Sequence, residues 1–239
     1  MDYVTVTDVL SWESEDAVLM EAAEILGDQA ADTLDQLCRD ILNAGTGAIY
    51  SGSGNTATAD VAAGDVIALA NLDSALATLK ANNAKKITRQ INPSTGYNTS
   101  PVRAAYVSIV HPVIGVKIKT LATAANTWTP VEKYASGADV MEGEIGTYNE
   151  IRFVETNNAK IKTGAGTAGI DVYCTLVFGA NAYGITRISG EALKNIVKPI
   201  GSAGSADPLD QRATSGWKAT FVAKILNENF IQRIESAAV

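Results

Sequence analysis

The most regular hydrophobic pattern in the chain is a helical stripe near the N-terminus. Apolar side chains recur every three or four residues, at Leu19, Ala23, Leu26, Ala30, Leu34, Leu37 and Ile41. Ser14 can cap such a helix, the acidic residues that follow it suit the first turn, and Asn43 and Gly45 can end it. The pattern therefore predicts one helix over residues 14–43, roughly 45 Å long at 1.5 Å per residue.

Two further features of this predicted helix bear on its role. Gly27 lies inside it, where glycine costs about 1 kcal/mol relative to alanine, so we expect a bend or close packing there. The side opposite the apolar stripe carries the acidic residues Glu21, Glu24, Asp28, Asp32 and Asp35. Such a run is either a solvated face or a charged contact with a neighbouring subunit.

Shorter patterns predict a second helix and a buried strand in the middle of the chain. Leucines 72, 76 and 79 share one face of a helix over residues 71–81, and a long polar connector follows at 88–101. Residues 104–110 are typical of a buried strand, which ends at His111-Pro112. Because proline suits the first position of a helix, these two residues predict a strand-to-helix corner.

The C-terminal half is rich in strand patterns. IRFVE at 151–155, DVYCTLVFG at 171–179 and NFIQRIE at 229–235 each predict a strand. Residues 214–225 alternate, which places Trp217, Ala219, Phe221, Ala223 and Ile225 on one side of a strand. The fold class that these patterns predict is α+β with one very long helix.

Composition and charge narrow the function. The chain has 239 residues, 46% of them hydrophobic and 19% charged, which is typical of a globular protein. Its net charge of -7, with scattered basic residues, argues against direct nucleic-acid binding. Cys38 and Cys174 show no disulfide framework, so we expect buried, reduced thiols. No run of 18 uncharged apolar residues predicts a membrane span, and the N-terminus lacks the pattern of a signal peptide.

Candidate chemistry is sparse. GAGTAG, Gly164 to Gly169, matches the dinucleotide fingerprint, but a strand pattern follows it where that motif needs a helix, which favours a flexible hairpin. A small-ligand-binding enzyme that uses this turn is the alternative. His111 is the only histidine, which removes most zinc sites and most Ser/His/Asp schemes.

Glu142 and Glu144 could form an acid–base pair, but the neighbouring glycines and the lack of a partner cation favour an exposed turn. We therefore expect no enzyme, and no catalytic, cofactor-binding or metal-binding residue.

A set of motifs along the chain is similar to a known family. In order, they are YVTVTDVL, ILGDQAADTLDQLCRDIL, LKANNAK, YVSIVHP, EKYASGADVMEGEIG, IRFVETNNAKI, VYCTLVFGANAYG and VKPIGSAGSADPLDQRATSGWKATFVAKILNENFIQRIE. Together they resemble the major capsid proteins of tailed bacteriophages, with the greatest likeness to the podophage branch, over essentially the whole chain. The resemblance implies the capsid fold shared with encapsulins: a long spine helix, a peripheral domain at 1–90 and 196–239, and an axial domain at 91–195.

The resemblance also implies a function. The subunit would self-associate, as pentamers and hexamers, into an icosahedral phage or prophage-derived shell that encloses DNA, with scaffold, portal or decoration proteins as further partners. It would be made in the bacterial host cytoplasm, reside in the virion capsid and contact DNA only indirectly and no membrane. A nanocompartment shell protein like the encapsulins is the alternative. Family members carry an N-terminal arm and an extended loop, of which only DYVTVTD remains here, so we expect a monomer or small oligomer in dilute solution.

The same resemblance gives a role to the corner before the last strands. Residues 203–214 would return the chain from the axial to the peripheral domain, and Trp217 would anchor the next strand in the core. Asp207 precedes a proline and suits a turn. We expect the guanidinium of Arg212 to bind Asp207 or Asp210 and so to fix this corner.

Overall fold

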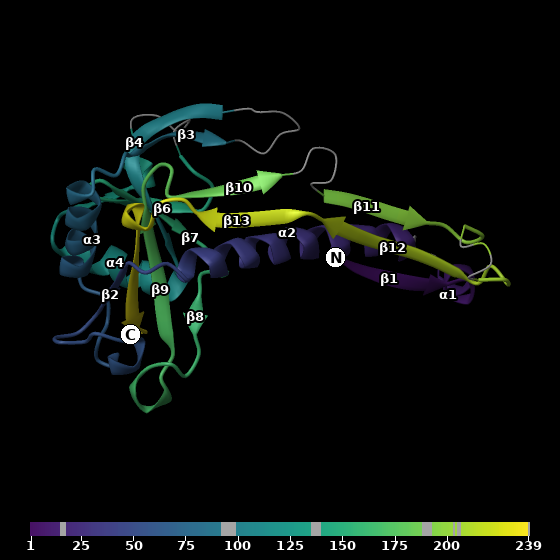
Figure 1. Ribbon diagram of the computed structural model, residues 1–239, viewed down its shortest axis with the longest axis horizontal. Helices are drawn as coiled ribbons and strands as arrows, with labels where there is room; N and C mark the ends of the chain where they lie inside the picture. Colours follow the sequence, from purple (N-terminus) through teal and green to yellow (C-terminus); the bar gives the residue numbers. More distant parts are fainter. Residues whose placement is uncertain are drawn as a thin grey trace. The chain divides into compact units, whose positions relative to one another are not determined.

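The computed structural model (Figure 1) combines helices and sheets, as the sequence predicts. It describes residues 1–14, 18–91, 99–134, 140–187, 193–202, 204 and 207–238. The chain forms two compact units, which we call unit 1 (Met1–Cys38 and Ile185–Ala223) and unit 2 (Arg39–Gly184 and Lys224–Val239). These boundaries differ from the predicted domains, because residues 39–90 and 224–239 belong to the same unit as most of 91–195.

Unit 1 contains a three-stranded antiparallel sheet and most of the long helix. The sheet has the order β1-β12-β11, with β1 at Asp2–Thr7, β12 at Arg212–Ala219 and β11 at Leu193–Lys198. Trp217 of β12 lies opposite Asp2 on one side and Asn195 on the other. A short helix, α1 (Asp8–Glu13), follows β1, and β13 (Phe221–Ile225) pairs with β10 (Tyr183–Arg187).

The predicted long helix is confirmed as one helix, α2, over Val18–Asn43. Ser14 has another role than predicted: it ends α1, and its backbone N–H donates to the carbonyl of Leu10 at 3.0 Å. The expected first turn at Glu15 and Asp16 lies outside the described residues. Leu37 was expected on the buried stripe but is 49% exposed, because the helix buries a different side, with Leu42, near its C-terminal end.

Unit 2 is built on a sheet with the main order β2-β14-β9-β4-β7-β6-β5, to which β3 adds on β4 and β8 on β9. The strands are β2 Ala48–Tyr50, β3 Ile87–Ile91, β4 Thr99–Val110, β5 Trp128–Pro130, β6 Glu144–Tyr148, β7 Ile151–Glu155, β8 Ile161–Lys162, β9 Val172–Phe178 and β14 Ile231–Ala237. Strands β4 and β7 are parallel, whereas β9 runs antiparallel to both of its long neighbours, β14 and β4.

Two helices pack on this sheet and form the main core. In α3 (Leu69–Ala81) the three leucines of the predicted stripe are buried. They join Ile114 and Ile118 of α4 (Pro112–Ala124) and Phe153 of β7 in one hydrophobic cluster. The corner before α4 is as predicted: His111 caps the helix, its Nδ1 accepts a hydrogen bond from the N–H of Val113 at 3.3 Å, and Pro112 occupies the first position.

Two sequence predictions for strands need correction. The polar connector at 88–101 contains strand residues at both ends, since β3 pairs antiparallel with the start of β4. Its residues 92–98 lie outside the described residues. The single strand predicted at 214–225 is two strands, which separate at Thr220 and enter different sheets. The predicted faces are nevertheless right, because Trp217 and Ala223 are buried and Lys218 and Lys224 are exposed.

Candidate assembly surface

Trp217 fixes the sheet of unit 1 to the long helix. Its side chain is only 7% exposed and packs in a small cluster with Leu26 and Ala30 of α2. Because side chains alternate along a strand, Val6 and Ala213 point to the same side and are also buried. The sheet therefore has an inner face, against α2, and an outer face made by the intervening residues.

A chain of polar contacts accompanies this packing. Trp217 Nε1 donates to Gln29 Oε1 at 3.4 Å, and Gln29 Nε2 donates to Asp2 Oδ2 at 2.7 Å. The hydrogen bond from Gln29 lowers the pKa of the Asp2 carboxyl below its ordinary value. These contacts join β1, α2 and β12. They form because β1 pairs with β12, which places Asp2 opposite Trp217. The sequence pattern around each residue does not reveal this pairing.

Gly27 lies on the exposed part of α2. A Cβ added there would have no atom within 4 Å, so close packing does not explain the glycine. The bend that the sequence suggested stays a prediction.

We expect Gly27→Ala to raise the free energy of unfolding by about 0.5–1 kcal/mol, because alanine restricts the unfolded chain and meets no obstacle in the helix. Denaturant unfolding followed by circular dichroism measures the change. Ala31→Gly, at another exposed position of α2, is the matched control and should lower stability by a similar amount. A loss of stability in Gly27→Ala would show that the backbone at this position is not an ordinary helix.

The corner at Asp207 is held through the backbone. Asp207 Oδ2 accepts a hydrogen bond from the backbone N–H of Arg212 at 2.8 Å, and the N–H of Asp210 donates to the carbonyl of Asp207 at 3.1 Å. The Arg212 side chain is exposed, on the outer face, and within the described residues its guanidinium has no ion pair with Asp207 or Asp210. The predicted guanidinium contact is therefore wrong, because the Asp207 carboxylate accepts from the backbone N–H of Arg212 and the guanidinium lies in solvent.

We expect Asp207→Ala to lower the free energy of unfolding by about 1 kcal/mol, the usual value of a side chain that caps backbone N–H groups. Arg212→Ala should change it by less than about 0.5 kcal/mol, as at ordinary exposed positions. Thermal unfolding of both variants compares them directly. A larger loss of stability in Arg212→Ala would support the guanidinium contact that the sequence suggested.

Exposed apolar side chains gather in unit 1. Nineteen large hydrophobic residues are exposed among those that the structure describes, and sixteen of them belong to this smaller unit. Tyr3, Trp12 and Met20 are each more than 70% exposed. Contiguous apolar surface on a folded protein usually marks a contact with another macromolecule.

A shallow hollow lies on the outer face of the unit 1 sheet. It has a volume of about 440 Å³, and Tyr3, Ile196, Lys198 and Lys218 are among the residues that line it. Gly216 provides its base, between Tyr3 and Ile196 in the register of the three strands. A side chain at Gly216 would place its Cβ 2.7 Å from that of Tyr3, so the hollow depends on this glycine.

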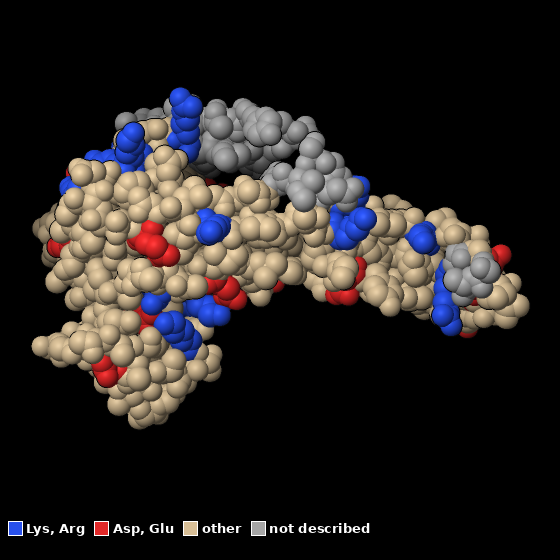
Figure 2. All heavy atoms as spheres, viewed as in Figure 1, with Lys and Arg blue, Asp and Glu red and all other residues tan. Residues whose placement is uncertain are grey.

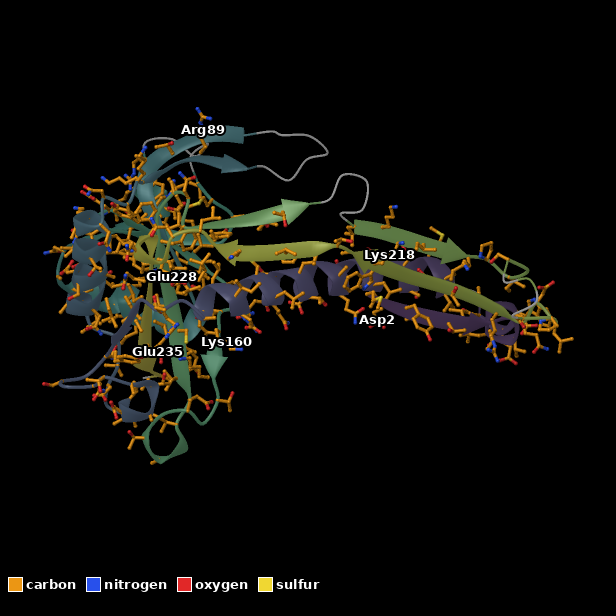
Figure 3. All side chains as sticks on the ribbon, viewed as in Figure 1. Asp2, Arg89, Lys160, Lys218, Glu228 and Glu235 are labelled. Carbon is orange, nitrogen blue, oxygen red and sulfur yellow. The ribbon has the colours of Figure 1, made fainter. Side chains whose placement is uncertain are left out.

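The charges of unit 1 are segregated. Lysines and Arg212 lie along the outer face of β11 and β12, where blue side chains are visible in Figure 2 and Lys218 is labelled in Figure 3. On α2 the acidic residues Glu21, Glu24, Asp28, Asp32 and Asp35 are all exposed, as expected for either a solvated face or a subunit contact. Unit 1 thus presents one basic and one acidic surface.

The turn at Gly164–Gly169 connects β8 to β9, and the predicted hairpin is confirmed. The N–H and hydroxyl of Thr167 donate to the carbonyls of Val61 and Ala59 at 2.9 and 2.8 Å, and the N–H of Gly164 donates to Asp171 at 2.8 Å. A strand, not a helix, follows. These N–H groups are used within the fold, so the turn lacks the geometry that holds a pyrophosphate.

Glu144 is not the exposed residue that the sequence suggested. Its carboxylate is fully buried and forms two hydrogen bonds with the buried Arg152, at 2.8 Å to Nε and 2.5 Å to the terminal nitrogen. Tyr134 and the backbone of Met141 donate to it as well, at 2.7 and 2.9 Å. Burial alone would raise the pKa of Glu144, but these donors, Arg152 foremost, lower it below its ordinary value.

The sequence patterns also gave no sign of a second buried carboxylate, that of Glu235. Glu235 of β14 is fully buried. Its Oε1 lies 2.5 Å from Lys162 Nζ and 2.6 Å from Arg233 Nε, and the Thr58 hydroxyl donates to its Oε2 at 2.6 Å. Burial opposes its ionisation, yet the hydrogen bonds from Lys162 and Thr58 keep its pKa below the ordinary value. The neighbouring Cys174 is buried as predicted, and burial and Glu235 raise its thiol pKa to about 11. Cys38 is only half-buried.

These buried charges join strands to one another and to loops. Among the described residues, no three His, Cys, Asp or Glu side chains are grouped as metal ligands. None of the helices in the described part of the chain is long and apolar enough to cross a bilayer.

Residues 7–189 match the family described as phage capsid protein. The chain belongs to the phage capsid protein family. Among curated proteins, no sequence is significantly similar to this capsid protein. The family assigns a structural, non-enzymatic role, which agrees with the surface described above.

Solved structures show that this capsid protein has the fold of tailed-phage capsids. The capsid protein of cyanophage P-SCSP1u matches with a TM-score of 0.63 and 17% identity, over 100% of this chain and 72% of that chain. That of cyanophage Pam1 matches with a TM-score of 0.66 and 14% identity, over 99% and 73%. The SrpI encapsulin of Synechococcus elongatus matches with a TM-score of 0.62 and 10% identity, over 99% of this chain and 72% of that chain. The predicted fold class, shared by phage capsids and encapsulins, is confirmed.

Proposed function

We propose that this capsid protein is the major shell subunit and self-associates into a closed icosahedral particle around DNA. The observation that carries the proposal is the concentration of exposed apolar side chains in unit 1 of a chain that belongs to the phage capsid protein family. A structural subunit needs no catalytic group, and its energy of association comes from apolar surface that the free chain leaves uncovered.

Within this proposal, unit 1 is the peripheral domain and unit 2 the axial domain. The long helix α2 and the β1-β12-β11 sheet in unit 1 support the first assignment, and the larger mixed sheet with α3 and α4 supports the second. Pentamers and hexamers of the subunit form the shell, in the virion, after synthesis in the host cytoplasm. Scaffold, portal or decoration proteins would bind the assembled subunits, and packaged DNA would be contacted only indirectly.

Assembly of the purified chain tests the proposal. We expect light scattering to show small species in dilute solution and, as the protein concentration rises, particles of uniform radius that electron microscopy shows as closed shells. Trp12→Asp, at an exposed residue of unit 1, should reduce particle formation. Leu226→Asp is the matched control at an exposed apolar residue of unit 2. A chain that stays monomeric at every concentration and salt would contradict the proposal.

The similarity to the SrpI encapsulin favours one alternative, a bacterial nanocompartment shell. This alternative uses the same fold and the same kind of self-association. Neighbouring genes distinguish the two: portal and terminase genes indicate a phage shell, and a gene for a cargo enzyme indicates a nanocompartment. The match to the phage capsid protein family supports the first.

A further inference from the structure

The two charged surfaces of unit 1 face away from each other. The outer face of the sheet, opposite α2, carries Lys194, Lys198, Lys218 and Arg212, and no acidic residue occupies an outward position in its three described strands. The acidic residues of α2 lie about half a turn around the helix from Leu26 and Ala30, which contact the sheet. One copy of unit 1 therefore presents a basic sheet face on one side and an acidic helix face on the other.

The spacings of the charges on the two faces are similar. Lys194 and Lys218 lie directly opposite each other on neighbouring strands, and Lys198 is four residues, about 13 Å, farther along the sheet. On α2, Glu24 and Asp32 are eight residues apart, which is about 12 Å along a helix. A helix laid along β11 would thus bring acidic groups near the lysines at both ends of the hollow.

Apolar groups complete the match. On the sheet, the hollow at Gly216 lies between Tyr3 and Ile196, which are 71% and 43% exposed. On the helix, Ile25 and Met20 flank the acidic residues and are 68% and 74% exposed. Either side chain could enter the hollow and cover apolar surface that the free chain leaves in water.

We propose that the acidic side of α2 in one copy docks on the outer face of the β1-β12-β11 sheet in a second copy. This inference rests on the proposed function and names one of its contacts. Because the two surfaces differ, each copy uses its sheet with one neighbour and its helix with the other, and such head-to-tail contacts build rings when the rotation closes. The contact supplies direction to the assembly and orients each copy through charge.

Reciprocal charge reversal tests the contact. The sheet variant is Lys198→Glu with Lys218→Glu, and the helix variant is Glu24→Lys with Asp28→Lys. All four side chains are exposed, so both variants should keep the far-ultraviolet circular dichroism and melting temperature of the wild type. Lys119→Glu with Lys133→Glu, at two exposed sites of unit 2, is the control that matches the sheet variant in charge.

Sedimentation velocity at low salt measures association of each variant alone and of an equimolar mixture. We expect each alone to self-associate on the order of tenfold more weakly than wild type, since like charges now meet. The helix variant should weaken although its net charge is closer to zero. The mixture should recover association, because each variant's sheet then meets the other's helix with opposite charges, and its closed rings should contain only even numbers of subunits.

The outcomes separate this contact from the proposed function. If the mixture sediments as the sum of its two components, the proposed contact is wrong, even if the wild type builds shells. If the mixture associates but no condition yields closed particles, the contact stands and the shell function fails. Equal weakening by the unit 2 control would show that net charge, and not this surface, governs association, and would also overturn the contact.

Discussion

Replacing Glu144 by glutamine should lower the free energy of unfolding by about 3–5 kcal/mol, the usual cost of removing one member of a buried ion pair. The loss arises because Arg152, which is 1% exposed, would keep its charge without the carboxylate that now accepts two of its hydrogen bonds. Denaturant unfolding at neutral pH measures the change. A variant as stable as the wild type would mean that water or another group compensates Arg152.

The double variant Glu144→Gln with Arg152→Met is the control, because it removes both charges. It should be more stable than Glu144→Gln alone, and the difference isolates the cost of burying Arg152 without the Glu144 carboxylate. The pH dependence gives a second readout. The pKa of Glu144 is lowered in the folded state, so its contribution is complete above the ordinary carboxyl pKa and disappears as the pH falls through the folded value. The variant should lack this part of the acid sensitivity.

Trp217→Ala should lower the free energy of unfolding by about 3–5 kcal/mol, as large-to-small changes of buried aromatic residues do. The cluster that Trp217 forms with Leu26 and Ala30 is small, so few other side chains can collapse into the space. Gln29 would also lose its contact with the indole N–H. Thermal unfolding measures the effect.

Trp12→Ala is the matched control for this prediction. Trp12 is also a tryptophan of unit 1 but is 77% exposed, so its removal should leave the melting temperature nearly unchanged. Trp217→Phe should retain part of the stability, since it keeps a ring in the cluster. Equal melting temperatures for Trp217→Ala and the wild type would contradict the inner face assigned to β12.

Local signals in the sequence were sufficient for much of the fold. The spacing of apolar residues predicted α2 and α3, the pair His111-Pro112 predicted the start of α4, and alternation placed Trp217 on the buried side of its strand. Each of these features depends on residues within a few positions of one another. A period of 3.6 or 2 residues records them directly.

Contacts between segments distant in sequence were not predictable in the same way. The connector at 88–101 contains strand residues because β3 and β4 pair, and its polar composition does not reveal the partner. Glu144 was expected to be exposed because its cation, Arg152, lies on the next strand, and only the β6–β7 hairpin brings them together. Charge complementarity suggested a bond between the Arg212 guanidinium and Asp207. It could not show that the backbone N–H of Arg212 would donate to Asp207 instead.

Strand β1 is an edge strand of the unit 1 sheet, and β12 is its only partner strand in the described part of the chain. Its residues DYVTVT are rich in β-branched side chains and contain neither the proline nor the lysine that often protect such edges. Concentrated stocks of free subunit are therefore at risk of ribbon-like precipitation, which competes with ordered growth for the same material. A lysine substituted for Thr5 would lower that risk. The variant would allow free subunit to be stored before assembly is started.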